Sequence, residues 1–335
     1  MDLGLFRMML ETDSTTGKEM EFALKLIEWL KTPGNRVETR EVGDGTLNLL
    51  FSWGTPKIFF CTHLDTVPPY ISPSFTTLPD GDVRIDGRGS CDAKGQIFSM
   101  FSTCKALEDE GFTDFGLLLL AGEETGSFGA QAWDRDCPGG DIVIVGEPTG
   151  NLQASAAKGT ASYEITIHGK SCHSGYPEGG VSAVERFIDF IRELREERFP
   201  EDPVLGATTW NVGSLVSANP QNILSPRLDF RLYFRTTFAS KKAVEAFMAK
   251  GREGFDVVCH GGDEPTEYTV WPGIGSAPVS FGSDAPRLHK FKRRSLLGPG
   301  SILDAHTPGE HILLSDITAA IENYKSIAKQ ILKRT

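Results

Sequence analysis

The sequence predicts an α/β protein in which helices flank a mixed, mainly parallel sheet and a smaller α+β domain is inserted into the chain. Three short apolar runs, within residues 58–62, 117–121 and 141–145, are typical of strands buried on both faces of a sheet. Helical stretches separate some of these runs, which favours parallel pairing. After residue 157 the pattern changes to alternating strands and amphipathic helices in the order β-α-β-β-α-β, which predicts a ferredoxin-like domain.

The same change in pattern sets the expected domain boundaries. A chain of 335 residues is long for one compact core, so one large or two smaller domains are expected. We expect residues 1–156 and 266–335 to form the domain that carries the buried strands, and residues 157–265 to form the inserted domain.

Periodicity and turn residues predict the individual elements. Apolar side chains at helical spacing predict helices over residues 18–31, 96–109, 181–198 and 241–250, and a last helix from residue 315. Further strands are expected at residues 47–51, 161–168, 209–216, 227–235 and 255–260, and a hairpin over residues 80–86.

Composition excludes several classes of partner. The 34 basic and 45 acidic residues give a net charge of −11, which argues against binding to nucleic acid or to an anionic membrane. The N-terminus lacks the layout of a signal peptide, and no apolar run approaches membrane-spanning length. The six cysteines are scattered without a Cys-x-x-Cys pair, so we expect free thiols and a cytoplasmic location.

The three buried strands each end at an acidic residue or a histidine. The first runs into His63 and Asp65, the second into Glu123 and Glu124, and the third into Glu147. Parallel sheets bind ligands at the carboxyl ends of their strands, so these side chains are expected to share one site. Adjacent carboxylates oppose each other's ionisation, and a metal ion is the simplest compensation. Taken alone, each motif also fits a solvated turn or surface loop.

A glycine-rich loop at residues 87–95 precedes the helix predicted from residue 96. Its spacing matches neither the Walker nor the dinucleotide-binding pattern, which argues against a nucleotide or pyridoxal enzyme. Asp92 lies in this loop at the helix start, where it can either bind a metal or simply cap the helix.

Together these motifs resemble a known family. The motifs, in chain order, are His63-x-Asp65, Gly89-x-x-Asp92-x-Lys94-Gly95, Glu123-Glu124, Glu147-Pro148, Gly298-Pro-Gly and His306-Thr-Pro-x-Glu310. They resemble the two-zinc aminoacylases and carboxypeptidases, which include acetylornithine deacetylase, succinyl-diaminopimelate desuccinylase and several di- and tripeptidases. The resemblance covers nearly the whole chain. It implies a zinc-peptidase-like catalytic domain with an inserted lid, through which the family usually forms homodimers.

Carried over residue by residue, the resemblance implies a centre of two divalent metal ions. Asp92 would bridge the two ions, with His63 and Glu147 completing the first position and Glu124 and His306 the second. Zinc is the expected metal because it accepts this mixed set of nitrogen and oxygen ligands, with cobalt or manganese as alternatives.

The resemblance also assigns catalytic roles. Asp65 would hold the imidazole of His63, and Glu123 would be the base that takes a proton from the attacking water and passes it to the departing amine. His173 matches a lid histidine that stabilises the oxyanion, in this family often from the neighbouring subunit. Whether His173 acts within its own chain or across a dimer stays open at this stage.

Substrate contacts are implied at three further positions. Arg235 matches the lid arginine that grips the carboxylate of the substrate, and Asn222 and Gly282 match neighbouring substrate-binding positions. The alternative for Arg235 is a solvated arginine on an open strand face shared with Arg227 and Arg231. The sequence departs from the family after the lid, where too few residues remain for a further helix.

These observations predict a metal-dependent amide hydrolase. The preferred reading is an amino-acid N-deacylase similar to acetylornithine deacetylase, acting on N-acyl ornithine, citrulline or lysine in arginine or lysine biosynthesis. The alternative within the family is a dipeptidase or carboxypeptidase acting on short peptides. An alternative of another class is a catalytically silent metal-binding protein, although a purely structural site needs no base such as Glu123.

Overall fold

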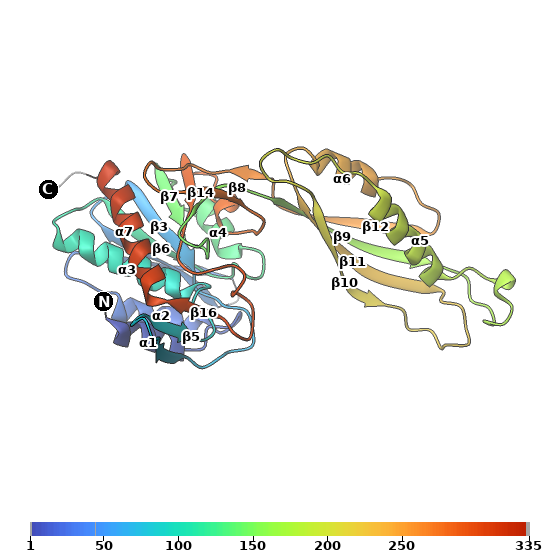
Figure 1. Ribbon diagram of the computed structural model, residues 1–335, viewed down its shortest axis with the longest axis horizontal. Coiled ribbons are helices and arrows are strands. Elements are labelled where there is room, and N and C mark those ends of the chain that lie inside the picture. Colours follow the sequence, from blue (N-terminus) through green and yellow to red (C-terminus); the bar gives the residue numbers. More distant parts are fainter. Residues whose placement is uncertain (1, 44, 333–335) are drawn as a thin grey trace. The chain divides into compact units, whose positions relative to one another are not determined.

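The protein is described by a computed structural model, which covers residues 2–43 and 45–332 (Figure 1). The chain divides into two compact units. Over the described residues, unit 1 comprises residues 2–43, 45–155, 268–277 and 283–332, and unit 2 comprises Ala156–Glu267 and Pro278–Gly282.

A six-stranded mixed sheet forms the centre of unit 1, counted over the described residues. Its order is β1-β2-β6-β3-β7-β15, in which β6, β3, β7 and β15 run parallel, while β2 pairs antiparallel with both β6 and the edge strand β1. The strands span Arg36–Val42, Thr46–Trp53, Phe115–Leu120, Ile58–His63, Ile142–Val145 and Arg293–Leu296 in that order. The mixed, mainly parallel sheet predicted from the sequence is therefore confirmed.

Helices pack on this sheet because their apolar side chains and those of the strands are buried against one another. Helix α3 packs against α7, β6 and β3, and α2 packs against β2, so that these helices and α1 share one large core with the sheet (Figure 1). Helix α4 contributes to a separate small apolar cluster with β1. The helices span Leu3–Glu11 (α1), Glu19–Trp29 (α2), Lys94–Asp109 (α3), Phe128–Asp136 (α4) and Leu314–Ile331 (α7).

Besides the six-stranded sheet and the four-stranded sheet of unit 2, the described residues form two small three-stranded sheets. One has the order β16-β5-β4 and the other the order β13-β8-β14. Their strands span Ser74–Thr77 (β4), Val83–Asp86 (β5), Gln153–Ala157 (β8), Thr266–Glu267 (β13), Ser276–Val279 (β14) and His311–Leu313 (β16). The segment after the lid thus forms two short strands, and no helix occurs in it, which agrees with the departure noted in the sequence.

Unit 2 has the predicted β-α-β-β-α-β order. Its four-stranded antiparallel sheet has the order β10-β11-β9-β12, and α5 and α6 cover one face of it (Figure 1). Side chains alternate along β11, where Phe230 and Leu232 are buried under the helices while Arg231 faces solvent. The elements span Gly159–His168 (β9), Ala183–Glu196 (α5), Thr209–Val216 (β10), Arg227–Thr236 (β11), Lys241–Met248 (α6) and Phe255–Gly261 (β12).

Several elements of unit 1 have no counterpart among the predictions. Helix α1 begins after Asp2, whose side chain accepts hydrogen bonds from the amide groups of Gly4 and Leu5. Strand β1 carries charged residues and lies at the edge of the sheet, so it lacks the apolar signal of a buried strand. Over the described residues, no helix is both long and apolar enough to cross a membrane.

Candidate metal centre and active site

The predicted metal ligands meet because their strands are neighbours. Strand β3 pairs in parallel with β6 on one side and β7 on the other, with His63 opposite Leu120 and Cys61 opposite Val145. The carboxyl ends of the three strands therefore lie at one edge of the sheet. His63 is the last residue of β3, and the turn with Glu123 and Glu124 and the segment with Glu147 follow directly after β6 and β7.

Asp92 lies between two histidines that are far apart in the sequence. Its Oδ1 is 3.0 Å from Nε2 of His63, and its Oδ2 is 3.2 Å from Nε2 of His306. Nε2 of His306 is also 3.0 Å from Oε1 of Glu124. One possible ligand atom each from His63, Asp92 and Glu124 lies within 4.8 Å of the others. Each oxygen of Asp92 thus faces a different histidine, which is the geometry that a bridging carboxylate requires.

The ionisation of these groups reflects their mutual contacts. Burial opposes protonation of His63, but hydrogen bonds to Asp65 and Asp92 outweigh this effect and raise its pKa. Hydrogen bonds to Asp92 and Glu124 raise the pKa of half-exposed His306 to about 10. Burial opposes ionisation of Asp92, but the two histidines outweigh it and lower its pKa. The carboxylates around each imidazole thus stabilise positive charge at that position.

Glu147 provides an independent test of whether a metal fits. Its side chain is 4% exposed, and its Oε1 has no hydrogen-bond partner within the described part of the chain. Burial, followed by the charge of Asp92, raises its pKa. A buried carboxylate oxygen without a donor is unfavourable, and a cation beside it removes that cost. The mixed set of imidazole and carboxylate groups therefore fits divalent metal ions.

Asp65 orders the turn that carries the predicted base. Its two carboxylate oxygens accept hydrogen bonds from the backbone amides of Glu123 at 3.0 Å and Glu124 at 3.1 Å. The nearest acceptor of Nδ1 of His63 is the main-chain oxygen of Asp65 at 2.9 Å, whereas its carboxylate lies 3.5 Å away. Asp65 therefore orients His63 mainly through its backbone and links that histidine to the glutamate turn.

Glu123 lies beside the ligand cluster without contacting either histidine in a described hydrogen bond. Burial raises its pKa, and the nearby carboxylates of Asp284, Glu124 and Asp92 add to the effect. A carboxyl group with a raised pKa is suited to accept and return a proton.

Two glycines allow the loops to approach closely. Gly122 has φ +67°, and a Cβ there would meet the ring of Phe128, so the turn between β6 and Glu123 requires glycine. A Cβ at Gly298 would collide with the side chain of Gln96 and the main-chain oxygen of Glu147. The Gly-Pro-Gly motif therefore packs tightly against the segment that carries Glu147.

The predicted residues of unit 2 fall at opposite ends of its sheet. His173 forms a bridge with Ile223, next to Asn222, just before β11 begins at Arg227. Arg235 lies near the other end of β11, and a Cβ at Gly282 would be 3.8 Å from its guanidinium. The eight residue steps from Arg227 to Arg235 span roughly 26 Å. In one chain His173 and Arg235 are therefore separated by about the length of β11.

Sequence reasoning assigned no role to three buried charged residues near the centre. Asp284 is 1% exposed, and neither of its oxygens has a hydrogen-bond partner among the described residues. Arg88 and Glu310 are similarly buried and form an ion pair. Glu310 ends the motif that begins at His306, but a motif does not reveal burial, which was the missing signal.

We expect Asp284→Asn to stabilise the metal-free protein at neutral and higher pH. Burial, opposed by His63, raises the pKa of Asp284 to about 7, whereas an unfolded aspartate titrates near 3.9. Because the folded pKa is the higher one, stability is lost as the pH rises from about 4 to about 7. The substitution should raise the unfolding free energy at pH 8 by up to about 4 kcal/mol.

Urea unfolding of the metal-free protein between pH 4 and pH 8 measures this effect. Asp80→Asn, at an exposed turn, is the control. Its unfolding free energy should depend on pH in the same way as that of the wild-type protein. If the unfolding free energy of the Asp284→Asn protein depended on pH as in the wild-type protein, the carboxyl group of Asp284 would not be the cause of the loss of stability.

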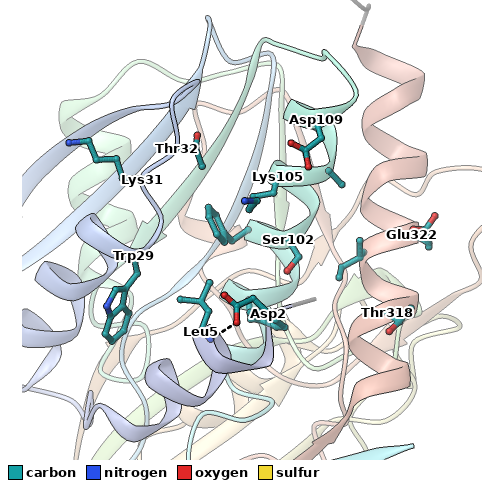
Figure 2. Close-up of a pocket in the computed structure, with 14 residues that line it drawn as sticks. Asp2, Leu5, Trp29, Lys31, Thr32, Ser102, Lys105, Asp109, Thr318 and Glu322 are labelled. Carbon is teal, nitrogen blue, oxygen red and sulfur yellow. Dashed lines mark hydrogen bonds between the residues drawn. The ribbon is translucent and has the colours of Figure 1, made fainter.

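A separate surface cavity of about 520 Å³ lies among the helices of unit 1 (Figure 2). Its lining comes from α1, α3, α7 and the end of α2, and Lys105 and Glu322 are among the residues around it. None of the predicted ligands or catalytic residues lines it. The cavity is therefore distinct from the candidate active site.

The fold and the site together define a hydrolase of the metallopeptidase type, with its centre at the strand ends of a mixed sheet and a separate α+β unit. A family model described as the peptidase dimerisation domain matches residues 155–259. A probable carboxypeptidase of Uncinocarpus reesii is 30% identical, and the alignment covers 99% of this chain and 87% of that protein. A peptidase M20 domain-containing protein of Schizosaccharomyces pombe is 29% identical, with coverages of 99% and 85%.

The chain belongs to the M20 family of peptidases. This confirms the resemblance inferred from the motifs and the prediction of a hydrolase that acts on carbon–nitrogen bonds.

Solved structures agree with the fold. A tripeptidase from Staphylococcus aureus has a TM-score of 0.81 at 18% identity, with 98% of each chain covered. An M20 metallo-carboxypeptidase from Sulfolobus solfataricus has a TM-score of 0.71 at 17% identity, covering 98% of this chain and 99% of that one. A dinuclear metal-binding M20 peptidase from Bacillus subtilis has a TM-score of 0.71 at 14% identity, covering 99% and 98%.

Proposed function

We propose that this protein is a metal-dependent carboxypeptidase or dipeptidase that cleaves short peptides next to a free C-terminal carboxylate. The main support for a metal-dependent reaction is the position of Asp92 between His63 and His306. The oxygen of Glu147 that has no described hydrogen-bond partner adds to it. The names of the sequence relatives favour a peptidase over the N-deacylase preferred from the sequence, because they are probable carboxypeptidases.

The proposed centre holds two divalent ions, as does the dinuclear metal-binding peptidase of Bacillus subtilis. We assign Asp92, Glu124 and His306 to one position because His306 contacts both carboxylates. We assign Asp92, His63 and Glu147 to the other, because His63 contacts Asp92 and the charges of both act on Glu147. Zinc is the proposed metal because the donor set is mixed nitrogen and oxygen.

In this proposal Glu123 acts as general base and then general acid. Divalent ions at the centre supply Lewis acidity toward the water and the substrate carbonyl. Glu123 accepts a proton from the attacking water and delivers it to the nitrogen of the leaving amino acid, which completes hydrolysis of the amide bond. The hydrogen bonds from its backbone and that of Glu124 to Asp65 hold the base in place.

Arg235 is the proposed anchor for the carboxylate of the substrate. Its guanidinium lies over the ring of Tyr233, 5.1 Å from the centroid, and no described acidic side chain forms an ion pair with it. By contrast, Arg227 pairs with Asp229 at 2.7 Å and Arg231 contacts Glu164 at 3.3 Å. Of these strand arginines, Arg235 is therefore the one left free for a bidentate carboxylate.

We further propose a dimer formed through unit 2 in which His173 serves the site of the partner subunit. The matched dimerisation domain covers most of this unit, and Leu215 and Val216 are exposed on the edge strand β10. The separation of His173 from Arg235 along the sheet supports this division, since one substrate can then receive an anchor from one chain and an oxyanion donor from the other.

A substrate panel tests the proposed activity. Purified protein loaded with zinc, cobalt or manganese is assayed with dipeptides, tripeptides, the same peptides amidated at the C-terminus, and acetyl and succinyl amino acids. We expect hydrolysis of the free peptides and at least about a tenfold loss of kcat/KM on amidation, because a charge-assisted contact is removed. Preference for acetyl or succinyl amino acids would instead support the N-deacylase reading.

Arg235→Ala should raise KM for free peptides by about 10- to 100-fold while kcat changes less, because it removes a contact made in both ground and transition states. The KM for amidated peptides should stay near its wild-type value. Arg231→Ala, on the same strand but in contact with Glu164, is the matched control and should behave as wild type. Equal losses on free and amidated peptides would contradict the proposed role.

A further inference from the structure

Glu310 is buried beside the candidate metal centre. In the described hydrogen bonds its carboxylate contacts only residues 88–92, which belong to the glycine-rich loop and are called the Asp92 loop below. Its Oε2 accepts a hydrogen bond from Nη1 of Arg88 at 2.5 Å. Its Oε1 accepts the backbone amides of Cys91 at 3.2 Å and Asp92 at 3.1 Å. Both oxygens of one carboxylate are therefore used to hold the segment that ends at Asp92.

The backbone around Glu310 strengthens the same connection. Its main-chain oxygen accepts a hydrogen bond from the amide of Gly87 at 3.0 Å, and β16, which follows directly, pairs with β5 before the glycine-rich loop. Arg88 is itself 2% exposed and donates through Nε to the main-chain oxygen of Pro69 at 3.2 Å. The loop is thus held at both its backbone and its side chains.

Glu310 also lies four residues after His306, on the same connecting segment. One short stretch of chain therefore supplies the imidazole that faces Oδ2 of Asp92 and the carboxylate that binds the amide of Asp92. A displacement of Glu310 would move Asp92 relative to His306, although Glu310 contacts neither imidazole in a described hydrogen bond.

The energetic cost of this arrangement argues against a purely stabilising role. A buried ion pair loses the hydration of both charges, so its net contribution to stability is small, and well-packed apolar residues of similar volume often replace it without loss. Its fixed geometry has a clear use here, because each oxygen of Asp92 faces a different histidine and a bridging ligand has to keep both oxygens in place.

We propose that Arg88 and Glu310 are positioning residues, which fix the carboxylate of Asp92 between His63 and His306 and couple the Asp92 loop to the His306 loop. This inference rests on the proposed role of Asp92 as a metal ligand. Loss of the Glu310 carboxylate should weaken metal binding by about 10- to 100-fold, the usual range for groups that orient a ligand.

Metal titration of the metal-free full-length protein tests the proposal directly. Zinc binding is measured by calorimetry, and the geometry of the site is followed by the absorption of bound cobalt. Glu310→Leu should show the full loss of affinity and an altered cobalt spectrum. Glu310→Gln keeps an oxygen that can accept the two amide hydrogens, so its loss should be less than about tenfold.

A control variant separates positioning from general destabilisation. Gln153 is a buried side chain that also joins distant segments, with hydrogen bonds to Trp271 and Ile274, and it lies outside the ligand loops. Gln153→Leu should lower the melting temperature of the metal-free protein but leave zinc affinity within about twofold of wild type. Equal losses of affinity in this variant and in Glu310→Leu would overturn the inference.

A double variant separates the ion pair from the positioning contact. Arg88→Met combined with Glu310→Leu replaces the buried charges with apolar groups, so stability should recover relative to Glu310→Leu alone. Zinc affinity should remain low, because the amides of Cys91 and Asp92 still lack their acceptor. Recovery of affinity together with stability would show that the pair acts only on folding.

The wild-type titration distinguishes this inference from the proposed function. If wild-type protein binds no metal, or Asp92→Ala binds it equally well, the proposed centre itself is wrong. If the wild-type protein binds two ions and Glu310→Leu binds them with the same affinity and spectrum, only the positioning role is wrong.

Discussion

Turnover should fall by at least about 10³-fold in Glu123→Gln, while the metal content remains equal to that of the wild-type protein. The amide of glutamine fills nearly the same volume but cannot accept a proton from water and return it to the leaving amine. Glu123 is not among the groups in direct contact with the two histidines, so its loss should leave the ligand set intact. Steady-state kinetics and elemental analysis of the purified protein measure the two quantities.

Its neighbour provides the matched control. Glu124 is the residue whose Oε1 lies 3.0 Å from His306, so Glu124→Gln should lower metal content as well as turnover. The two variants differ by one position on a single turn. If Glu123→Gln lost metal while Glu124→Gln retained it, the roles of base and ligand would be exchanged.

His173→Ala should lower kcat by about 100-fold with little change in KM, as expected for a donor that acts on the oxyanion of the transition state. If that donor comes from the partner subunit, His173→Ala and Asp92→Ala chains should complement each other in mixed dimers. The mixed dimer has one site with an intact ligand set and an intact histidine opposite it. Random exchange at equal amounts then restores roughly a quarter of wild-type activity.

A second mixture makes the test specific. The proposal assigns Arg235 to the site of its own chain and His173, at the opposite end of the sheet, to the site of the partner subunit. Arg235→Ala mixed with Asp92→Ala should therefore show no rescue. Rescue in this mixture but not in the first would reverse the assignment of the two residues, and no rescue in either would count against a shared site.

Much of the fold could be predicted from local signals. The apolar runs at β3, β6 and β7 identified buried strands, because a strand covered on both faces has no polar side to reveal. Alternation along β11 and the amphipathic pattern of α5 identified unit 2 as an α+β unit. The predictions failed for β1 and α4, which have mixed polar sequences and depend on neighbouring elements for their order.

The candidate site divides in the same way. Which residues follow the buried strands could be predicted from local sequence, because an apolar run and the polar residue after it are adjacent in the chain. The expectation that His63, Glu124 and Glu147 share one edge followed from the rule that parallel strands end at the same edge of a sheet. The sequence also indicated the family through the order of its motifs.

The contacts between distant loops became visible only in the folded chain. The tertiary structure placed Asp92 between two histidines, buried Asp284 without a partner, and joined Arg88 to Glu310 across 222 positions of sequence. It also separated His173 from Arg235 by the length of a strand. Burial and contacts between loops depend on the packing of the whole chain, and no local periodicity encodes them.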